Sequence, residues 1–377
     1  MGATGTQGFR GTEAHPWPYL AHPQQYTKER RTYLRSYGES EARDRRATTA
    51  QIKKGGKELT MALQVIRYEQ AGSAAWGVHR NGRILPLDGS WQTTGSFFTE
   101  GGPAAAAAAS GDGVIALADV HLLSPVTPDR DYICQATNYA SHLREIGRDP
   151  KDQVNNVIFH KASSCLSGSN DDVIKPRHVK LLDYEVELGL VVATPVNGPI
   201  DPTPQSLHKW IGGLVVTNDI SAREIQVSHE QFCKAKSYRT FGPTGPFLVL
   251  PEPRELERWG DLVLTLSVNG KERQCAPASD MIFDPVATLS ELSRIRDLRP
   301  GDLIATGTPS GVAIKVPSAA VMFVAKFMSP AARYKAFLKG QLKNPAYLKE
   351  GDLIECGIAS PDGSIDLGRQ RTLVRAE

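Results

Sequence analysis

The sequence contains no run that approaches the roughly 18 consecutive apolar residues of a transmembrane helix. Its five cysteines form no C-x-x-C pair and are scattered at Cys134, Cys165, Cys233, Cys275 and Cys356. This spacing argues against a zinc ribbon or a disulfide scaffold and fits a reducing compartment. The N-terminus also lacks the apolar core of a secretory signal, so we expect a cytoplasmic protein that does not bind membranes.

The basic excess of the sequence lies at its N-terminal end. Residues 1–60 contain 11 lysines and arginines against 6 acidic residues, whereas residues 61–377 contain 33 against 35. Because the first sixty residues show no hydrophobic periodicity, burial cannot offset the entropy of ordering them, and we predict a disordered tail or a non-native extension. A basic arm for nucleic acid is the less favoured alternative, and we expect no nucleic-acid partner.

A short segment before Met61 bears on where the natural chain starts. The segment KKGGKEL, Lys53–Leu59, consists almost wholly of residues with purine-rich codons, as a translated ribosome-binding site would. We hypothesise that Met61 is the native start. The intact mass of the protein made from its natural gene would test this hypothesis.

From residue 61 onward the sequence alternates short β runs with turns, as folded domains do. Residues 61–128 combine such runs with an alanine-rich connector and predict a small N-terminal α/β domain. Residues 129–377 contain many β runs and fewer helical patterns. The helical patterns cover residues 204–210, 221–233 and 285–294. We therefore predict an α+β, β-rich fold, a mixed β-roll or sandwich with short helices, and not alternating βαβ units.

Two segments, 298–307 and 348–357, share the frame L-x-x-G-D-L-I-x-x-G. Glycine permits a tight turn and aspartate caps it before a strand, so we predict a reused strand entry and not a duplicated domain. Residues 317–348 lie between them and predict a helical insertion with alternating apolar and basic residues. This insertion could cover a pocket or extend a dimer contact.

The segment KLLDYEVELGLVV places three carboxylates at alternating positions, Asp183, Glu185 and Glu187. On a strand such positions share one face, so the charges repel unless water, lysine or arginine, or a hard cation relieves them. The continuation GLVVATPV is apolar on both faces, which indicates a buried strand and disfavours relief by water. Oxygen ligands alone suit Mg²⁺, Mn²⁺ or Ca²⁺ better than zinc.

A further acid, Asp219, stands where the apolar run GGLVV ends and a helical pattern opens at Ser221. An aspartate at such a junction is usually a helix N-cap. Arg223 and Gln226, three positions apart on the following helix, would share a face near Asp219 and favour a functional site as the alternative.

Several motifs follow one another from about residue 131 to residue 312: NYASH, FHKASS, DYEVEL, TNDISAREIQ, AKSYRTFGPTGPFLV, MIFDPVATLSELS and GDLIATGTPSGV. Each motif is weak alone, but their order resembles the fumarylacetoacetate hydrolase family, with GDLIECGI as the closing strand. The resemblance implies the C-terminal fold of that family for residues 129–377. It also implies a homodimer.

In this family the E-x-E strand and the N-D-x-S-x-R turn supply the ligands of a divalent metal. The resemblance implies that Glu185, Glu187 and Asp219 bind Mg²⁺, or Mn²⁺ or Ca²⁺, while water and substrate oxygens complete the coordination. Some members use a fourth acidic ligand, and Asn138 stands near that position here. Asp183 is expected to make a local hydrogen bond or salt bridge.

The same resemblance implies catalytic roles for three residues. His142 and Glu145 lie at i and i+3 of a predicted helix, where His142 would activate water and Glu145 would orient the imidazole. Lys236 would stabilise an oxyanion and an enolate. Without the family context, a chance pair on a surface helix and a solvated lysine remain the simpler interpretations. Residues expected to contact substrate are Arg223, Gln226, Thr308, Lys161 and Tyr139, the last also explained by core packing.

The leading functional hypothesis is a metal-dependent hydrolase that cleaves a carbon–carbon bond in a small-molecule keto acid: a β-diketone, an acylpyruvate or a 2,4-diketo acid. The alternative keeps the site and changes the outcome, to decarboxylation, tautomerisation or isomerisation of a 2-keto acid, or hydration of a 2-hydroxydienoate. A metal-binding protein without enzymatic activity is the least favoured interpretation, because it leaves the dyad and the lysine idle.

Overall fold

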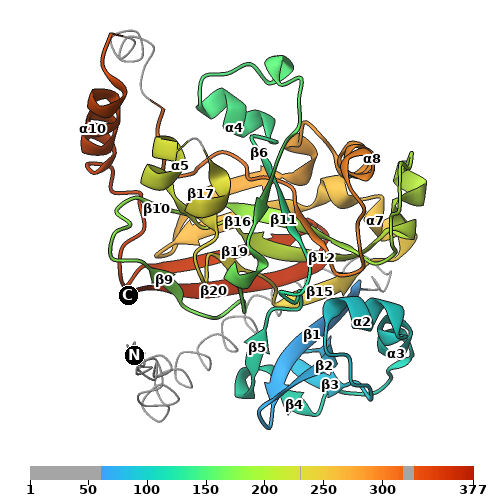
Figure 1. Ribbon diagram of the computed structural model, residues 1–377. Helices are drawn as coiled ribbons and strands as arrows, with labels where there is room; N and C mark the ends of the chain where they lie inside the picture. The colour runs from blue at the N-terminus through green and yellow to red at the C-terminus, as the bar shows by residue number, and fades with distance from the viewer. Residues whose placement is uncertain (1–60, 230, 317–326) are drawn as a thin grey trace, which may run out of the picture. The chain divides into compact units, whose positions relative to one another are not determined.

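The computed structural model describes residues 61–229, 231–316 and 327–377 (Figure 1). The predictions for residues 1–60 and for the first part of the insertion, 317–326, lie outside these ranges. Of the helices within them, none combines the length and apolar character that crossing a membrane requires.

The described residues form two large β-sheets with short helices. The first sheet has the strand order β4-β3-β2-β1-β15-β12-β11-β18-β6-β7, with β5 paired to β1. Its strands are β1 (Leu63–Gln70), β2 (Ser73–Arg80), β3 (Arg83–Pro86), β4 (Ile115–Ala116), β5 (His121–Leu123), β6 (Tyr132–Ala136), β7 (Val157–Lys161), β11 (Val186–Val192), β12 (Ile211–Asn218), β15 (Phe247–Leu250) and β18 (Leu303–Ala305).

The second large sheet has the order β17-β16-β19-β20-β9. Its strands are β9 (Val173–Lys175), β16 (Val263–Val268), β17 (Lys271–Pro277), β19 (Leu353–Ala359) and β20 (Asp366–Ala376). The two sheets pack together, since β11 and β12 contact β16, β19 and β20. Two small sheets pair β8 (Leu166–Ser167) with β14 (Gly242–Pro243), and β10 (Leu182–Asp183) with β13 (Ser221–Ala222).

The helices are short. The α-helices are α2 (Thr94–Thr99), α3 (Gly102–Ala108), α4 (Ala140–Glu145), α5 (Arg223–His229), α6 (Phe232–Lys236), α7 (Pro253–Leu256), α8 (Pro285–Ile295) and α10 (Pro330–Gln341). The 3-10 helices are η1 (Leu117–Asp119), η2 (Pro150–Asp152), η3 (Ser163–Cys165), η4 (Pro204–Lys209), η5 (Trp259–Asp261) and η6 (Ala278–Asp280). This architecture confirms the predicted α+β, β-rich fold with short helices.

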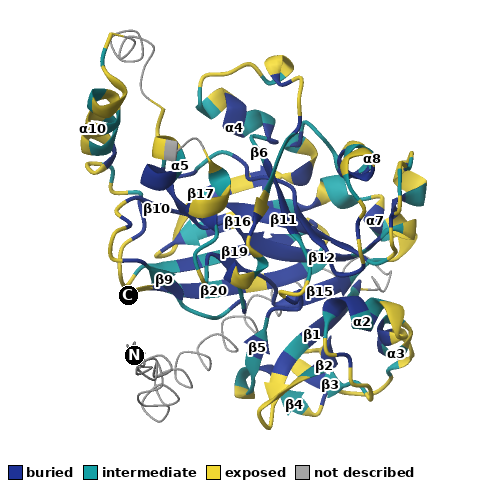
Figure 2. Cartoon of the chain, viewed as in Figure 1, coloured by how far each residue is buried: buried dark blue, intermediate teal, exposed yellow. Residues whose placement is uncertain are grey.

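Strands β11 and β12 lie in the buried centre because their sequences are apolar on both faces. Every residue of β11 is buried, and β12 is buried apart from Gly212 (Figure 2). Strands of this kind are stable only when both of their faces are covered. The second sheet covers one of these faces. Glu187 in β11 and Glu185 directly before it are therefore held away from solvent.

The repeated L-x-x-G-D-L-I frame is confirmed as a strand-entry device. Gly301 and Gly351 adopt φ values of 93° and 87°, a left-handed conformation that glycine adopts without strain. The carboxylates of Asp302 and Asp352 accept hydrogen bonds from backbone N–H groups three residues earlier, at 2.8 and 2.7 Å. The two turns lead into β18 and β19, which belong to different sheets.

Two of the three predicted helical segments differ from the expectation. Residues 204–209 form the 3-10 helix η4, and the segment 221–233 begins as strand β13 before α5 and α6. Ser221 and Ala222 are extended because they pair with Asp183 and Leu182 of β10. Tertiary pairing overrides the helical pattern there, whereas α8 forms as predicted behind its Asp284 N-cap.

The first sheet runs across the predicted domain boundary near residue 128, because β1 pairs with β15 from Leu63 to Ile66. The division into domains at that residue stays a prediction. The second part of the insertion forms helix α10, which begins behind the Ser329 N-cap and lies against α5 (Figure 1).

Candidate metal centre and active site

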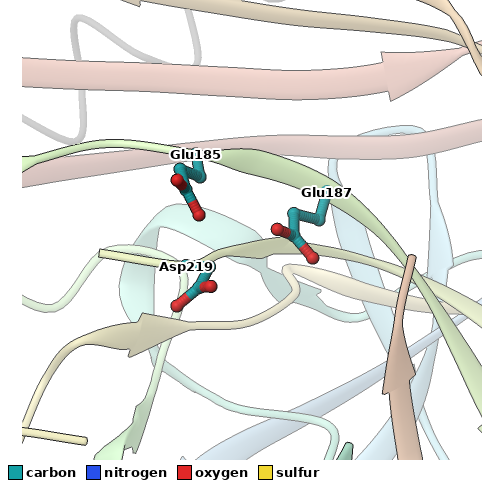
Figure 3. A group of neighbouring side chains, drawn as sticks. All are labelled: Glu185, Glu187 and Asp219. Atoms are coloured by element: carbon teal, nitrogen blue, oxygen red, sulfur yellow. The ribbon is translucent and has the colours of Figure 1, made fainter. Parts of the chain in front are cut away.

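Glu185, Glu187 and Asp219 meet because two central strands pair side by side. Glu185 directly precedes β11, Glu187 lies within it, and Asp219 follows the last residue of β12. The register pairs Val186 with Asn218, and the Asp219 N–H donates to the Glu185 carbonyl oxygen at 2.8 Å. The three carboxylates are buried and point toward one another, with ligand atoms within 4.8 Å (Figure 3). We call them the carboxylate triad.

Three buried cations face two members of the triad. Lys236 at the end of α6 donates from Nζ to Glu185 Oε2 at 2.6 Å and also to Asp219 Oδ2. Lys161 at the end of β7 donates to Asp219 Oδ1 at 2.6 Å, and Arg223 donates from Nη2 to Glu185 Oε1. Each of these carboxylate oxygens retains lone-pair capacity for one further ligand.

Asp183 is not part of the triad, and its carboxylate instead binds Arg223 and the surrounding backbone. Its carboxylate accepts from Arg223 Nε at 2.8 Å and from the backbone N–H groups of Tyr184, Ala313 and Ile314 at 2.8, 2.8 and 3.0 Å. This confirms the expected local hydrogen bonds and salt bridge. It also fixes Arg223, whose other donor reaches Glu185.

Glu187 is the carboxylate left without a cation. In the described residues its side chain accepts the Gly307 N–H at 3.0 Å, and no lysine or arginine lies within salt-bridge distance. Burial, with Asp219 and Glu185 nearby, raises the pKa of Glu187 well above its usual value. At Glu185 burial acts in the same direction, but Arg223 and Lys236 outweigh it and lower the pKa to about 2.

The triad fits a hard divalent cation. Four buried carboxylates, the triad and Asp183, meet three cations, so one negative charge remains on Glu187. An isolated charge in such a site is costly and favours a metal ion or a proton as its partner. The donor atoms are all oxygens, which suits Mg²⁺, Mn²⁺ or Ca²⁺.

The predicted catalytic dyad forms on α4. His142 Nδ1 lies 3.4 Å from Glu145 Oε2, and both side chains are largely buried. Glu145 also accepts the Gly311 N–H at 3.1 Å and the Lys315 ammonium at 2.8 Å. Burial opposes ionisation of Glu145, but these hydrogen bonds outweigh it and lower the pKa to about 2. Glu145 is therefore a carboxylate that can orient an imidazole.

One segment of chain, residues 307–315, joins the dyad to the triad. Its first residue, Gly307, donates to Glu187, and four residues later Gly311 donates to Glu145. Gly307 adopts a φ of 84° and leaves 3.0 Å between an added Cβ and the Asn138 Cβ, so a larger residue would strain this link. The dyad and the triad are thus tied to the same short loop after β18.

Asn138 forms hydrogen bonds with the backbone on both sides of this site. Its Nδ2 donates to the carbonyl oxygens of Thr306 and Phe283 at 2.8 and 3.0 Å, and its Oδ1 accepts the Phe283 N–H at 2.8 Å. Both amide hydrogens and one lone pair of Oδ1 are therefore used by the surrounding backbone. The ligand set of three carboxylates stays a prediction.

Comparison with known proteins decides the family. A family model described as fumarylacetoacetate (FAA) hydrolase C-terminal matches residues 131–375, and one described as Rv2993c-like, N-terminal, matches residues 64–125. The chain belongs to the fumarylacetoacetate hydrolase family. Members of this family commonly depend on a metal, and they include hydrolases, isomerases and tautomerases.

Several known proteins are similar to this chain. An uncharacterised protein of Pyrococcus abyssi is 38% identical over 184 residues, which cover 48% of this chain and 78% of the relative. Oxaloacetate tautomerase YisK of Bacillus subtilis is 35% identical over 208 residues, which cover 54% of this chain and 66% of the relative. The solved fumarylacetoacetate hydrolase of Exiguobacterium antarcticum superposes with a TM-score of 0.60 at 29% identity, covering 84% of this chain and all of that one.

The residues that we predict to contact substrate differ in their surroundings. Gln226 is half-buried and accepts from Arg223 Nη1 at 2.8 Å, so these two side chains form one unit beside Glu185. The Thr308 hydroxyl donates to the Val186 carbonyl at 2.9 Å and accepts from Gln274 at 2.8 Å. Their contacts with substrate stay predictions, and the Thr308 hydroxyl is already engaged by the scaffold.

Lys161 and Tyr139 are both buried. The Lys161 ammonium donates to Asp219 and, at 2.7 Å, to the Phe241 carbonyl, so it supports a triad member directly. A salt bridge from Lys161 to a substrate carboxylate stays a prediction. Tyr139 is fully buried and forms an isolated β-bridge with Met281, and burial raises its pKa well above the usual value.

The family resemblance also implies that Phe159 lies near the substrate carboxylate, together with its neighbours His160 and Lys161. The Phe159 ring centroid lies 5.3 Å from the Lys236 ammonium, and a contact of Phe159 with substrate stays a prediction. Sequence reasoning missed two residues around the site. Gln274 accepts the Val186 N–H and donates to Thr308, and Lys315 pairs with Glu145. Nothing local marks these two residues, since their partners are distant in sequence.

Proposed function

We propose that this chain is a divalent-metal-dependent enzyme that hydrolyses a carbon–carbon bond of a β-diketone, an acylpyruvate or a 2,4-diketo acid. The observation that carries the proposal is the buried carboxylate of Glu187, which lacks a cationic partner in the described residues. The same loop also holds the His142–Glu145 dyad. A site for a cation beside an imidazole that can take a proton supports hydrolysis assisted by a metal.

Glu185, Glu187 and Asp219 would hold the ion. When bound, it supplies Lewis acidity toward the two oxygens of a keto acid. Lys236 would place a second positive charge next to the ion, because its ammonium donates to both Glu185 and Asp219 at the edge of the triad. A fixed ammonium of this kind stabilises negative charge that develops on a substrate oxygen.

His142 would then transfer the proton that hydrolysis requires, and Glu145 would orient its imidazole. His142 takes a proton from water through Nε2 while Nδ1–H donates to Glu145, and the hydroxide forms a bond to the carbonyl carbon distal to the carboxylate. The bond between that carbon and the neighbouring methylene breaks, and its electron pair remains on the departing enolate near Lys236. His142 returns the proton to the enolate carbon. One water is consumed. An acylpyruvate or a 2,4-diketo acid gives a carboxylic acid and a 2-keto acid, and a β-diketone cleaved in the same way gives a carboxylic acid and a ketone.

A second candidate is keto–enol tautomerisation of a 2-keto acid. The similarity to oxaloacetate tautomerase YisK, at 35% identity, favours it. The same imidazole would take a proton from the carbon next to the keto group and return it elsewhere, without consuming water. The two candidates therefore share every residue of the site and differ in whether water attacks carbon.

The deciding experiment measures two reactions on the protein with Mg²⁺. Acylpyruvate hydrolysis removes the ultraviolet band of the diketone and produces two acids, which titration detects. Tautomerisation of the enol of oxaloacetate changes absorbance without releasing an acid fragment or carbon dioxide. Release of two acids supports the hydrolase, absorbance change without products supports the tautomerase, and carbon dioxide release opposes both.

A further inference from the structure

Lys315 links the predicted dyad to the C-terminal part of the predicted insertion, where helix α10 ends. Its side chain is 58% exposed, and its ammonium lies 2.8 Å from Glu145 Oε1. An exposed lysine has many rotamers, and an isolated surface ion pair holds its partners weakly. Lys315 can fix Glu145 only if its own backbone is held in place.

The end of the insertion supplies that restraint. The side-chain amide of Gln341, the last residue of α10, pairs with both backbone groups of Lys315: Nε2 donates to the carbonyl at 2.7 Å, and Oε1 accepts the N–H at 3.3 Å. Gln341 is buried and accepts the Tyr347 hydroxyl at 2.7 Å. Asn344 Nδ2 donates to the Ala313 carbonyl at 2.7 Å. We call Gln341, Asn344 and Tyr347 the clamp.

The opposite side of the same loop is bound to Asp183, which lies next to the triad. Asp183 accepts the N–H groups of Ala313 and Ile314 and also pairs with Arg223, which contacts Glu185. Residues 313–315 are therefore held between Asp183 on one side and the clamp on the other. This leaves the Lys315 side chain directed to Glu145 from a fixed backbone.

We propose that the clamp makes the C-terminal end of the insertion, residues 341–347, part of the active site: it holds Lys315 so that the ammonium positions Glu145, and through Glu145 the imidazole of His142. Lys315 and Gln341 are positioning residues and not catalytic residues. This inference rests on the proposed function only for what the dyad does. The placement of α4 by the clamp can be tested without turnover.

The charges around Glu145 agree with this role. His142 faces it from α4, Lys315 and the Gly311 N–H face it from the 307–315 loop, and the Tyr184 hydroxyl lies nearby with Arg273 beside it. Within residues 61–229, 231–316 and 327–377, Lys315 is the permanent cation that bonds Glu145 directly. Its loss would leave Glu145 held by one backbone N–H and by the imidazole it is meant to orient.

The test uses the full chain and five substitutions. Lys315→Met removes the cation, Lys315→Arg restores it, and Gln341→Leu removes the clamp amide. Lys339→Met, at an exposed lysine of α10, is the matched control. Tyr347→Phe is a milder clamp variant, because it deletes one hydroxyl bond to Gln341, and it replaces Gln341→Leu if that variant does not fold.

Hydrogen–deuterium exchange is the first readout. The α4 turn is closed by the N–H groups of Leu143, Ile146 and Arg148. These amides should exchange several-fold faster in Lys315→Met and in the clamp variants, and at the wild-type rate in Lys339→Met. Unchanged exchange of α4 in every variant would overturn the proposal.

Steady-state kinetics on an acylpyruvate with Mg²⁺ is the second readout. Lys315→Met should lower kcat about ten-fold with KM nearly unchanged, since a misplaced base affects the chemical step more than binding, and Lys315→Arg should restore most of the rate. A fall in both Lys315 variants alike would reject the charge-dependent role. If wild-type protein turns over no keto acid, the proposed function fails, while the exchange experiment still decides the clamp.

Discussion

Glu185 and Glu187 lie two residues apart, yet the pKa values of their carboxyl groups are shifted in opposite directions. Burial alone would raise the pKa of both carboxyl groups. At Glu185 the guanidinium of Arg223 and the ammonium of Lys236 outweigh burial, whereas Glu187 experiences the negative charges of Asp219 and Glu185 in addition to it. A bound cation would therefore change the free energy of Glu187 more than that of its neighbour.

Glu187→Gln should separate metal binding from folding. Without divalent ions and at neutral pH the variant should be at least as stable as wild type, because folded wild type must either keep a proton on Glu187 or bury its charge without a cation, and the amide does neither. With free Mg²⁺ at 100 times Kd, wild type should gain about 2.7 kcal/mol and the variant much less. Thermal unfolding with and without MgCl2 measures this, with exposed Glu272→Gln as the matched control. An equal Mg²⁺ effect in both proteins would exclude Glu187 as a ligand.

The affinity for Mg²⁺ should rise with pH. The raised pKa of Glu187 means that the folded protein holds a proton above pH 4.5, which the ion must displace. For the same reason, metal-free protein should lose stability as pH rises from 4.5 through the folded pKa, because the unfolded chain has already released that proton. Calorimetric titrations in buffers of different ionisation enthalpy should show release of up to about one proton. Binding that is independent of pH would contradict this.

The sequence predicted those parts of the site that depend on local periodicity. Alternation along one strand places Glu185 and Glu187 on a shared face, and burial of β11 follows from its apolar continuation. The same alternation did not predict that Asp183 leaves this face. It belongs to β10, which pairs with a separate short strand, and its carboxylate binds the 313–314 backbone instead.

The parts that the sequence could not predict depend on distant contacts. The Lys315–Glu145 pair joins residues 170 positions apart, and Lys161 and Asp219 are separated by 58. No periodicity connects such positions, and an exposed lysine after a glycine-rich turn carries no local sign of its partner. The strand β13 was missed for the same reason, since its pairing with β10 outweighs its helical pattern.

Lys161→Met should be strongly destabilising in metal-free protein. The substitution leaves the buried carboxylate of Asp219 with one ammonium in place of two and removes the donor to the Phe241 carbonyl. Breaking a buried ion pair from one side costs about 3–5 kcal/mol. Urea unfolding in the presence of chelator measures the change, and exposed Lys209→Met should be close to neutral.

The double variant Lys161→Met with Asp219→Asn decides whether the pair itself is responsible. If the cost arises from the unpaired carboxylate, removing its charge should recover part of the lost stability, and the two substitutions should be strongly non-additive. Additive effects would show that Lys161 contributes through packing and not through Asp219.

Glu145→Gln should alter both acid stability and turnover. The pKa of about 2 lies below the ordinary value of 4.5, so ionised Glu145 contributes stability that is present above pH 4.5 and is lost as pH falls toward 2. The glutamine cannot ionise, so the difference in unfolding free energy between wild type and variant should shrink across that window. Urea unfolding at several pH values from 5.5 to 2.5 measures it, with exposed Glu350→Gln as control. At neutral pH kcat should fall about 100-fold, because His142 loses the carboxylate that orients it. A constant stability difference, or an unchanged kcat, would contradict the role assigned to Glu145.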